Sequence, residues 1–396
     1  MPGLRYGVVT FKGRPAGRLT ETSSGGSLFT YDDGWTEDIG CALPAAIREH
    51  AWPVGLHPFF QHLGPEGWLR NRQARTAEIA DEDDLGLLLR YGHDCIGAVS
   101  LDDPSQADDA TAGKDLDALT AAAVAAKRTL SGVQPKLLAR REGEGYVQAD
   151  SSGPAPVIAK FSTDDLPSLV ANEQLSMELT CLLLGKAEVA GTEIGFVTGI
   201  ERPALIVHRF DRTLTGEALR MEDFAQVLLK PRGSTFHGKY DSGFEDVGEA
   251  LLRHSARRII DAARLFERIV VFALLGNCDC HLKNFSLLET VDGMRLSPAY
   301  DVVNTYVYAA QGYSTRFGLR IDGRDVAWDQ VDRDLLAGLG RRLGLAEKAI
   351  QRAFLKLAGK RDAVLARLRP KVELASGDWR ELYWLSVNEA WGRILP

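Results

Sequence analysis

The chain has 396 residues, of which 45% are hydrophobic and 26% charged, and its formal net charge is −7. This composition is typical of a globular protein and excludes a disordered chain. No apolar run approaches the roughly 20 residues that cross a bilayer, and the N-terminus lacks the apolar core of a signal peptide. Five dispersed cysteines argue against a disulfide framework. We therefore expect a cytoplasmic protein with no membrane partner and no general attraction to nucleic acid.

Residues 1–101 predict a small α/β subdomain. Alternating apolar residues indicate strands, and apolar residues three and four apart indicate helices. The predicted strands are Gly7–Phe11 and Ser27–Tyr31, and the predicted helices are Leu56–Leu69 and Asp84–Arg90. Residues 102–120 are rich in Asp, Ala, Ser and Gly, which predicts an acidic linker.

Beyond the linker, residues 121–212 predict a mixed α/β lobe and residues 213–396 a mainly helical one, so we expect an α+β fold. The first lobe combines strands at Lys136–Ala139, Tyr146–Ala149, Pro156–Phe161 and Ala204–Phe210 with a helix at Ser168–Leu184. The second has helical periodicity across Ser255–Leu275, Arg333–Leu343, Glu347–Leu368 and Trp379–Trp391. One interruption, Phe285–Tyr300, predicts a β-hairpin with a turn at Val291-Asp292-Gly293.

The segment Leu275–Ser286 has the most informative spacing in the chain. Asp279 and Asn284 form the D-x-x-x-x-N pattern of a kinase catalytic loop, in which the Asp accepts the proton of an attacking hydroxyl and the Asn holds a magnesium ion. The predicted hairpin then returns the chain to the same place at Asp301, which offers the metal a carboxylate. Oxygen ligands with phosphate as co-ligand suit Mg²⁺.

Residues upstream of this loop complete the requirements of phosphoryl transfer. Lys160 ends the strand Val-Ile-Ala-Lys, which resembles the V-A-I-K strand of kinases. Glu173 is the candidate partner of Lys160, and Glu178 is a second one. In the turn before the first strand of the lobe, Gly132 allows backbone amides to approach phosphate, and Lys136 adds charge.

Each of these features has an ordinary explanation when it is taken alone. A single D-x-x-x-x-N pattern arises often by chance, and a lysine at a strand end is usually a surface residue. Together they follow the order of a kinase: turn, strand lysine, helical glutamate, Asp/Asn loop, hairpin, aspartate. A zinc site at Cys278, Cys280 and His281 is the weaker alternative, because a second pair of ligands is missing. We interpret His281 as orienting the Asp279 loop.

The same segments resemble the HipA family of toxin kinases over nearly the whole chain. The N-terminal stretches Leu56–Leu69 and Asp84–Leu101 are similar to the N-terminal subdomain of that family. The stretches that carry the kinase resemblance are Ser131–Lys136, Ile206–Arg212, Gly276–Ser286 and Leu296–Asp301. The resemblance implies a bilobal kinase-like core with a mixed α/β N-lobe and a mainly helical C-lobe.

The resemblance also implies roles for individual residues. Asp279 would be the catalytic base, and Asn284 and Asp301 would hold Mg²⁺. Lys160 would contact the phosphates of ATP, and the hinge would hold the adenine mainly through backbone groups and the Phe210 ring. The implied nucleotide-binding residues are Ser131, Gly132, Val133, Gln134, Lys136, Lys160, His208, Arg209, Phe210, His281, Lys283, Asn284, Tyr300 and Asp301.

Kinases of this family phosphorylate serine or threonine side chains of proteins, and their known targets are aminoacyl-tRNA synthetases. Because the charging of tRNA is then blocked, translation and growth stop. They commonly pair with HipB, a helix-turn-helix antitoxin that binds operator DNA, so contact with DNA would be indirect. Autophosphorylation in the phosphate-binding loop is a family habit, and Thr129 and Ser131 are the candidates here. Thr129 stands where the family usually has a serine, Pro135 where an acidic residue is expected, and His208 where a Glu is familiar.

Two other functions remain open from the sequence. A small-molecule phosphotransferase uses a similar Asp/Asn/Asp arrangement, although the N-terminal subdomain speaks against it. A catalytically silent binding protein would commonly have lost one of Asp279, Asn284, Asp301 or Lys160. The basic stretch Arg341–Lys371 is interpreted as the solvated face of helices, with contact to DNA or an acidic partner as the alternative.

Overall fold

The structure of the chain, a computed structural model, describes residues 3–104, 119–120, 128–130, 134–149, 153–233, 237–373 and 378–396. The chain divides into two compact units. The first unit comprises residues 1–165 and 193–238, and the second comprises residues 166–192 and 239–396. Both units combine helices with strands, as expected for an α+β protein.

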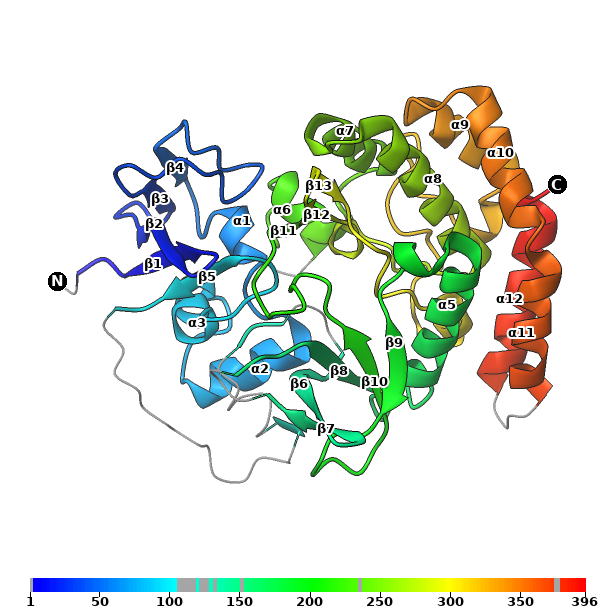
Figure 1. The fold of residues 1–396 in the computed structure, drawn as a ribbon, viewed down its shortest axis with the longest axis horizontal. Helices are drawn as coiled ribbons and strands as arrows, with labels where there is room; N and C mark the ends of the chain where they lie inside the picture. Colours follow the sequence, from blue (N-terminus) through cyan, green and yellow to red (C-terminus); the bar gives the residue numbers. More distant parts are fainter. Residues whose placement is uncertain are drawn as a thin grey trace. The chain divides into compact units, whose positions relative to one another are not determined.

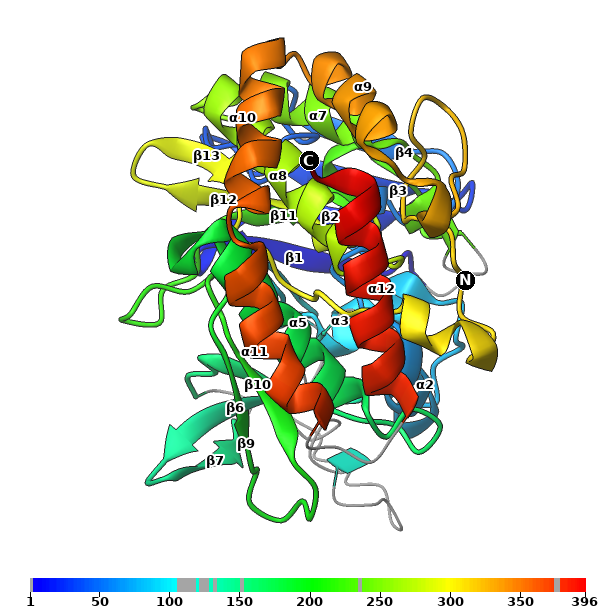
Figure 2. The ribbon, with the colours of Figure 1, turned by 90° about the vertical axis from the view of Figure 1, so that its right-hand side faces the viewer.

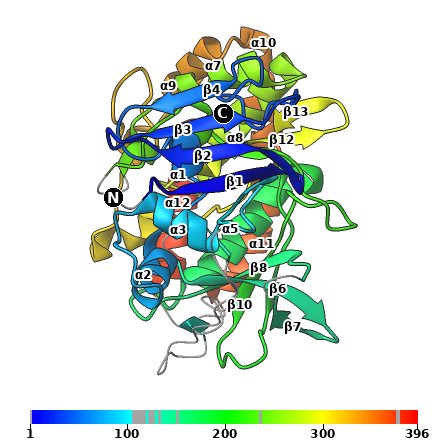
Figure 3. The ribbon, with the colours of Figure 1, turned by 90° about the vertical axis from the view of Figure 1, so that its left-hand side faces the viewer.

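The first unit begins with a five-stranded antiparallel sheet of order β4-β3-β2-β1-β5, and Figure 3 shows β1 to β4 side by side. Lys12 and Gly13 connect β1 to β2 with φ angles of 51° and 73°, as a tight two-residue hairpin turn requires. Val9, Phe29 and Phe60 are fully buried in the core of this block. Its elements are β1 (Tyr6–Phe11), β2 (Arg14–Glu21), β3 (Ser27–Tyr31), β4 (Glu49–Trp52), α1 (Pro58–Gln61), α2 (Gly67–Thr76), α3 (Asp84–Tyr91) and β5 (Val99–Asp102).

The first unit also contains a second sheet, of order β7-β6-β8-β10-β9. β8 pairs antiparallel with both β6 and β10, so it lies in the middle of the sheet and is largely buried. Leu69 of α2 belongs to the same apolar core as Phe161 and Ile206 of the sheet. The strands of this sheet are β6 (Lys136–Glu142), β7 (Gly145–Gln148), β8 (Val157–Phe161), β9 (Thr192–Gly195) and β10 (Ala204–His208). The first unit also includes β11 (Met221–Asp223) and α6 (Phe224–Val227).

The second unit is mainly helical. Helix α8 is central to it and contacts α5, α7, α9 and α12, as well as β13 (Figure 1). Helix α11 packs against both α5 and α12, and Figure 2 shows these three helices side by side. The elements are α5 (Leu169–Leu184), α7 (Phe244–His254), α8 (Arg258–Leu274), β12 (Ser286–Thr290), β13 (Gly293–Leu296), α9 (Arg333–Arg342), α10 (Glu347–Ala358), α11 (Arg361–Glu373) and α12 (Asp378–Ile394).

Most of the predicted elements are confirmed with small shifts of their ends, including the hairpin, which is β12 and β13. Two long helical predictions are wrong in one respect, because each contains a break. The first, Leu56–Leu69, is interrupted around Gly64-Pro65, and the second, Glu347–Leu368, is interrupted at Gly359. Strands β2, β4, β5, β9 and β11 were not predicted; β2 contains Pro15 and Gly17, two residue types that are rare in strands.

Candidate active site

The loop that carries Asp279 follows directly from the end of α8. Gly276 has φ +68°, and a Cβ atom there would lie 2.7 Å from the side-chain oxygen of Asn304, so this turn requires glycine. The carbonyl of Gly276 accepts from the N–H of Tyr306 at 3.1 Å, and the N–H of Cys278 donates to Thr305 Oγ1 at 2.9 Å. Hydrogen bonds to the chain beyond Asp301 therefore fix the shape of this loop.

Asn284 and Asp301 lie side by side. The side-chain nitrogen of Asn284 donates to Asp301 Oδ2 at 3.1 Å. The side-chain oxygen of Asn284 accepts from the N–H of His281 at 3.0 Å, and the N–H of Asn284 donates to the carbonyl of His281 at 2.9 Å. Asp301 has φ +58°, a left-handed conformation that is uncommon outside glycine, although aspartate adopts it more readily than most residues, and that is concentrated at functional sites.

The β12–β13 hairpin brings these two side chains together, and α8 holds the hairpin in place. Asp261 of α8 is fully buried and accepts two hydrogen bonds from the guanidinium of Arg295 at 2.8 and 2.7 Å. It also accepts from the Ser255 hydroxyl at 2.6 Å and from the N–H of Leu296 at 3.0 Å. These four charge-assisted bonds lower the pKa of Asp261, although burial opposes them.

Tyr300 links the two ends of the hairpin next to Asp301. Its hydroxyl donates to the backbone carbonyl of Lys283 at 2.7 Å and lies 2.5 Å from the hydroxyl of Ser286. On the other side, Ala299 pairs with Val189 in a parallel bridge. The backbone around Asp301 is thus held from two directions, which keeps the Asn284–Asp301 pair in one geometry.

Asp279 is accessible to solvent, yet protein atoms surround its carboxylate densely. The Tyr240 hydroxyl donates a hydrogen bond to Asp279 Oδ1. Loss of hydration raises the pKa of Asp279, and the nearby Asp301 adds to this effect, whereas Lys239 and the Tyr240 hydroxyl oppose it. A carboxylate with a raised pKa is a better proton acceptor at neutral pH than an ordinary aspartate.

The donor set around Asn284 and Asp301 fits a hard divalent cation. Asp301 offers carboxylate oxygens, whereas Asn284 turns its amide nitrogen to Asp301 and its oxygen to the N–H of His281, so this amide would have to rotate to give Mg²⁺ an oxygen ligand. Mg²⁺ with phosphate co-ligands needs few protein groups. The zinc alternative fits poorly, because burial raises the pKa of the Cys278 thiol to about 12 and also raises the pKa of the Cys280 thiol. Among the residues that the structure describes, no group of three His, Cys, Asp or Glu side chains gathers as a metal site.

Lys136 and Lys160 are direct neighbours in the second sheet of the first unit. The antiparallel pairing of β6 and β8 places them opposite one another, and each is only 6% exposed. Residues directly opposite one another in an antiparallel pair project from the same face of the sheet, so one polyanion can contact both ammonium groups. Two lysines from separate motifs therefore form a single candidate phosphate contact.

The predicted hinge begins at the end of β10, where His208 is exposed and lies 3.4 Å from the carboxylate of Glu193. Arg209 does not offer its side chain to a ligand. Its guanidinium is buried and pairs with Asp211 at 2.7 Å, and its backbone N–H donates to the carbonyl of Pro156. Asp211 also accepts from the N–H of Gly97 at 2.8 Å, so this ion pair joins the N-terminal block to the second sheet.

This ion pair predicts a specific acid sensitivity of the first unit. Burial alone would raise the pKa of Asp211, but Arg209 and Arg212 outweigh it and lower the pKa to about 2, from 3.8 for an ordinary aspartate. The resulting stability, about 2 kcal/mol, is present above pH 4 and is lost as the pH falls toward 2. In urea unfolding experiments, the free energy of unfolding of the wild type should therefore be much larger than that of Asp211→Asn at pH 6. The difference between the two should be smaller at pH 3. A difference that does not change with pH would contradict this assignment.

The remaining predicted residues are placed as follows. Gln134 is half-buried just before β6, Phe210 is half-buried after β10, and Lys283 is buried in the catalytic loop. Glu173 lies on α5 in the second unit and is 1% exposed, and its pairing with Lys160 of the first unit stays a prediction. Ser131, Gly132 and Val133 lie outside the described residues. Thr129 is described, and its side chain is buried at 1% exposure.

Half of the ten basic residues in the stretch Arg341–Lys371 form ion pairs within the second unit. Arg341, Arg342, Lys356, Arg367 and Lys371 each contact a carboxylate within 3.1 Å. This supports the interpretation as a solvated helical face. Glu178 is the partner of both Arg367 and Lys371, which favours Glu173 over Glu178 as the partner of Lys160.

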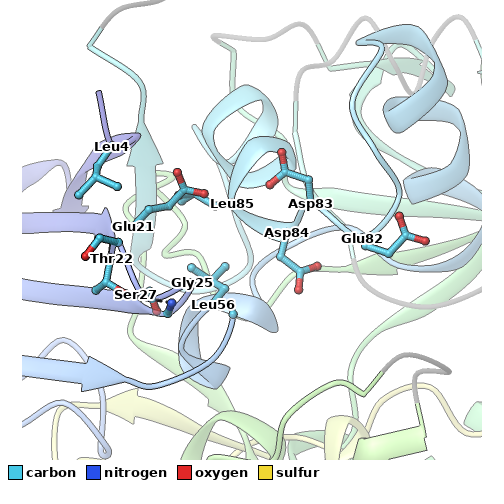
Figure 4. A pocket seen from close by; sticks show the side chains of 13 residues that line it. Leu4, Glu21, Thr22, Gly25, Ser27, Leu56, Glu82, Asp83, Asp84 and Leu85 are labelled. Carbon is cyan, nitrogen blue, oxygen red and sulfur yellow. Dashed lines mark hydrogen bonds between the residues drawn. The ribbon is translucent and has the colours of Figure 1, made fainter. Parts of the chain in front are cut away.

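A separate cavity of about 360 Å³ lies in the N-terminal block, between the β2–β3 turn and the start of α3 (Figure 4). Its acidic lining residues are Glu21, Glu82, Asp83 and Asp84, and arginines pair with three of these carboxylates. Arg5 pairs with Glu21 and Asp83, and Arg70 pairs with Asp84 at 2.8 Å. These ion pairs explain the acidic lining as part of the fold.

Two residues at the candidate site were given no role in the sequence analysis, although Asn277 lies within the Gly276–Ser286 stretch. Asn277 donates no side-chain hydrogen bond within the described structure, but its oxygen accepts from the N–H of Asp279 at 3.2 Å. Its place two residues before Asp279 could have singled it out. Tyr240 lies 39 residues upstream of Asp279 in His237-Gly-Lys-Tyr240, a stretch with no recognisable pattern.

In the described residues, no helix is long and apolar enough to span a bilayer.

Comparison with known proteins places these features in one family. The HipA-like C-terminal domain matches residues 128–363, and the HipA N-terminal domain matches residues 8–102. A Sinorhizobium fredii protein named "Putative kinase Y4mE" is 28% identical over 393 residues, which is 91% of each chain. The "Serine/threonine-protein kinase toxin HipA" of Shewanella oneidensis is 28% identical over 212 residues, 49% of this chain and 46% of that one.

The fold agrees with these matches. A chain in the solved complex of the Shewanella oneidensis toxin–antitoxin proteins HipA and HipB with operator DNA superposes with a TM-score of 0.73 at 18% sequence identity. The superposition covers 99% of this chain and 97% of that one. The α+β architecture is therefore kinase-like, as predicted. Since the C-terminal domain match alone covers more than half of the sequence, the chain belongs to the HipA family.

Proposed function

We propose that this chain transfers the γ-phosphate of ATP to a serine or threonine hydroxyl of a protein. The contact between Asn284 and Asp301, five and 22 residues beyond Asp279 in the chain, is the observation that carries the proposal. A kinase needs a base and a set of metal-binding oxygens in this arrangement. Asp279, with its raised pKa, supplies the base.

Each residue then has a defined task. Asn284 and Asp301 would hold Mg²⁺, which, when bound, neutralises charge on the phosphates. Lys136 and Lys160 contact phosphate oxygens, and the strand end at His208–Phe210 holds the adenine through backbone groups and the Phe210 ring. Asp279 accepts the proton of the acceptor hydroxyl as the new phosphate ester forms. Catalysis in this scheme comes from positioning and electrostatics rather than from a covalent intermediate with the protein.

We propose further that the activity arrests growth and that a HipB-like helix-turn-helix antitoxin neutralises it. The similarity to a toxin kinase of Shewanella oneidensis and the likeness to a chain in a HipA–HipB–DNA complex support this role. Contact with DNA would then pass through the antitoxin. An aminoacyl-tRNA synthetase is the proposed substrate.

Regulation by autophosphorylation at Thr129 or Ser131 is a further part of the proposal. Thr129 is buried, so a kinase could reach its hydroxyl only after the segment opens. A phosphate there would add nearly two negative charges to a buried position and would keep the segment open.

The test is incubation of the purified chain with γ-labelled ATP, Mg²⁺ and a bacterial lysate. We expect label on a discrete protein band, and no label with the Asp279→Asn variant or with EDTA. Identification of that band by mass spectrometry would test the synthetase assignment separately. Label on small molecules alone would instead support the phosphotransferase alternative and contradict the proposal.

A further inference from the structure

The side chain of Tyr240 reaches the carboxylate of the proposed catalytic base. Its hydroxyl donates to Oδ1 of Asp279, which is one of the two oxygens that could accept a proton. The Asp279 side chain is accessible to solvent, so without a partner its carboxylate could rotate between several orientations. A hydrogen bond to one oxygen selects an orientation and directs the second oxygen elsewhere.

Tyr240 is itself held by the framework that shapes the Asp279 loop. Its ring packs edge-on against His281, with ring centroids 5.1 Å apart and an interplanar angle of 77°. Its backbone carbonyl accepts from the N–H of Ser242 at 2.9 Å, and the carbonyl of Ser242 accepts from the N–H of Arg320 at 3.1 Å. The tyrosine ring therefore has a defined position from which to orient a neighbour.

The segment that contains Arg320 also contacts the Asp279 loop directly. The N–H of Gly318, two residues before Arg320, donates to the carbonyl of Cys278 at 3.1 Å. Gly318 has φ +49°, and a Cβ atom there would lie 2.4 Å from the carbonyl oxygen of Cys280, so the close approach requires glycine. Tyr240 and Asp279 are thus attached, through Arg320 and Gly318, to one network of backbone hydrogen bonds.

We propose that Tyr240 is the positioning residue of the catalytic base: its hydroxyl holds Oδ1 of Asp279 and leaves Oδ2 to accept the proton of the acceptor hydroxyl. This inference rests on the proposed kinase function. It assigns a role to a side chain that lies outside the Asp/Asn/Asp motif. Lys239, whose ammonium lies 5.5 Å from the centre of the Tyr240 ring, adds a positive charge close to the same carboxylate.

The opposite role for the contact is a block, in which the Tyr240 hydroxyl occupies the place of the acceptor hydroxyl and must leave before catalysis. The two roles predict changes of opposite sign when the hydroxyl is removed. Tyr240→Phe keeps the ring against His281 and removes the hydroxyl alone. Tyr91→Phe is a matched control, because it removes a tyrosine hydroxyl that donates to the carbonyl of Gln73 at 3.1 Å in the N-terminal block.

The experiment compares the full-length wild type, Tyr240→Phe and Tyr91→Phe in three measurements. These are the initial rate of phosphate transfer from ATP to protein, with casein as added acceptor, the Kd for Mg·ATP, and the Tm. For Tyr240→Phe we expect a rate about 10- to 100-fold below that of the wild type, since a hydrogen bond to a charged group is lost. The Kd for Mg·ATP should stay within about twofold, and the Tm should match that of Tyr91→Phe.

The outcomes separate this inference from the function on which it rests. An active wild type with an equally active Tyr240→Phe variant would overturn the positioning role, and a faster variant would overturn it in favour of the block. A fall in rate that is matched by weaker Mg·ATP binding and a lower Tm than that of Tyr91→Phe would show a structural role instead. A wild type that transfers no phosphate, while it binds Mg·ATP, contradicts the proposed function itself.

Discussion

Replacement of Asp279 by asparagine is expected to lower the rate of phosphate transfer by about 100- to 10,000-fold, the range typical of the loss of a general base. Asparagine keeps the size of the side chain and can still contact Tyr240, but it cannot accept a proton from the acceptor hydroxyl. The rate is measured as label transferred from γ-labelled ATP to protein. The Kd for Mg·ATP should change little, because the phosphate and metal contacts are assigned to other residues.

The stability of this variant provides its control. Loss of hydration and the proximity of Asp301 raise the pKa of Asp279, so the ionised carboxylate is held at an energetic cost in the fold. Asp279→Asn removes that charge, and we expect a Tm equal to or slightly above that of the wild type. If Asp279→Asn is inactive and also unfolds at a lower temperature than the wild type, its inactivity does not identify Asp279 as the base. Full activity of Asp279→Asn would exclude Asp279 from the reaction.

Replacement of Asp261 by asparagine is expected to destabilise the second unit by about 3 kcal/mol. This carboxylate accepts four hydrogen bonds, two of them from Arg295, and it is fully buried. Asparagine would take away the nearest counter-charge of the mostly buried Arg295 guanidinium and leave it only the half-exposed Asp292 at 4.0 Å, which is the costly way to break a buried pair. Urea unfolding followed by far-UV circular dichroism gives the change in free energy.

Asp292, in the turn of the same hairpin, is the matched control. It pairs with Arg257 at 2.7 Å, but its side chain is 45% exposed, so Asp292→Asn should cost less than about 1 kcal/mol. A double variant, Asp261→Leu with Arg295→Met, should recover part of the stability that Asp261→Asn loses, since no buried charge is then left unpaired. A cost below 1 kcal/mol for Asp261→Asn would mean that this ion pair does not hold the hairpin.

Hairpin destabilisation should also reach the candidate site. Asp261 binds the backbone of Leu296, five residues before Asp301, and the two strands of the hairpin separate Asn284 from Asp301 in the chain. The Asn284–Asp301 contact therefore depends on a carboxylate that no ligand would touch. A residue outside the catalytic motif can in this way position the proposed metal ligands.

The amino-acid sequence by itself determined the chemistry of the candidate site. The Asp279/Asn284 spacing and the hairpin that leads to Asp301 are local features, because chain connectivity over a few tens of residues limits where these side chains can lie. The strand that contains Lys160 and the helix that carries Glu173 were equally readable, since both are runs rich in apolar residues. Strand β2 could not be predicted from its sequence, because proline and glycine are rare in strands and because β2 forms by pairing with the neighbouring strands β1 and β3.

Only the tertiary structure decided which distant residues support that chemistry. Tyr240 contacts Asp279 across 39 residues of sequence, and Arg209 turns away from a ligand because Asp211 holds it. Neither fact follows from a motif, since a motif records residue types at fixed spacing and not the direction of a side chain. The reactive groups lie within short segments that the chain itself connects, whereas the groups that orient them belong to segments brought together only by packing and backbone hydrogen bonds.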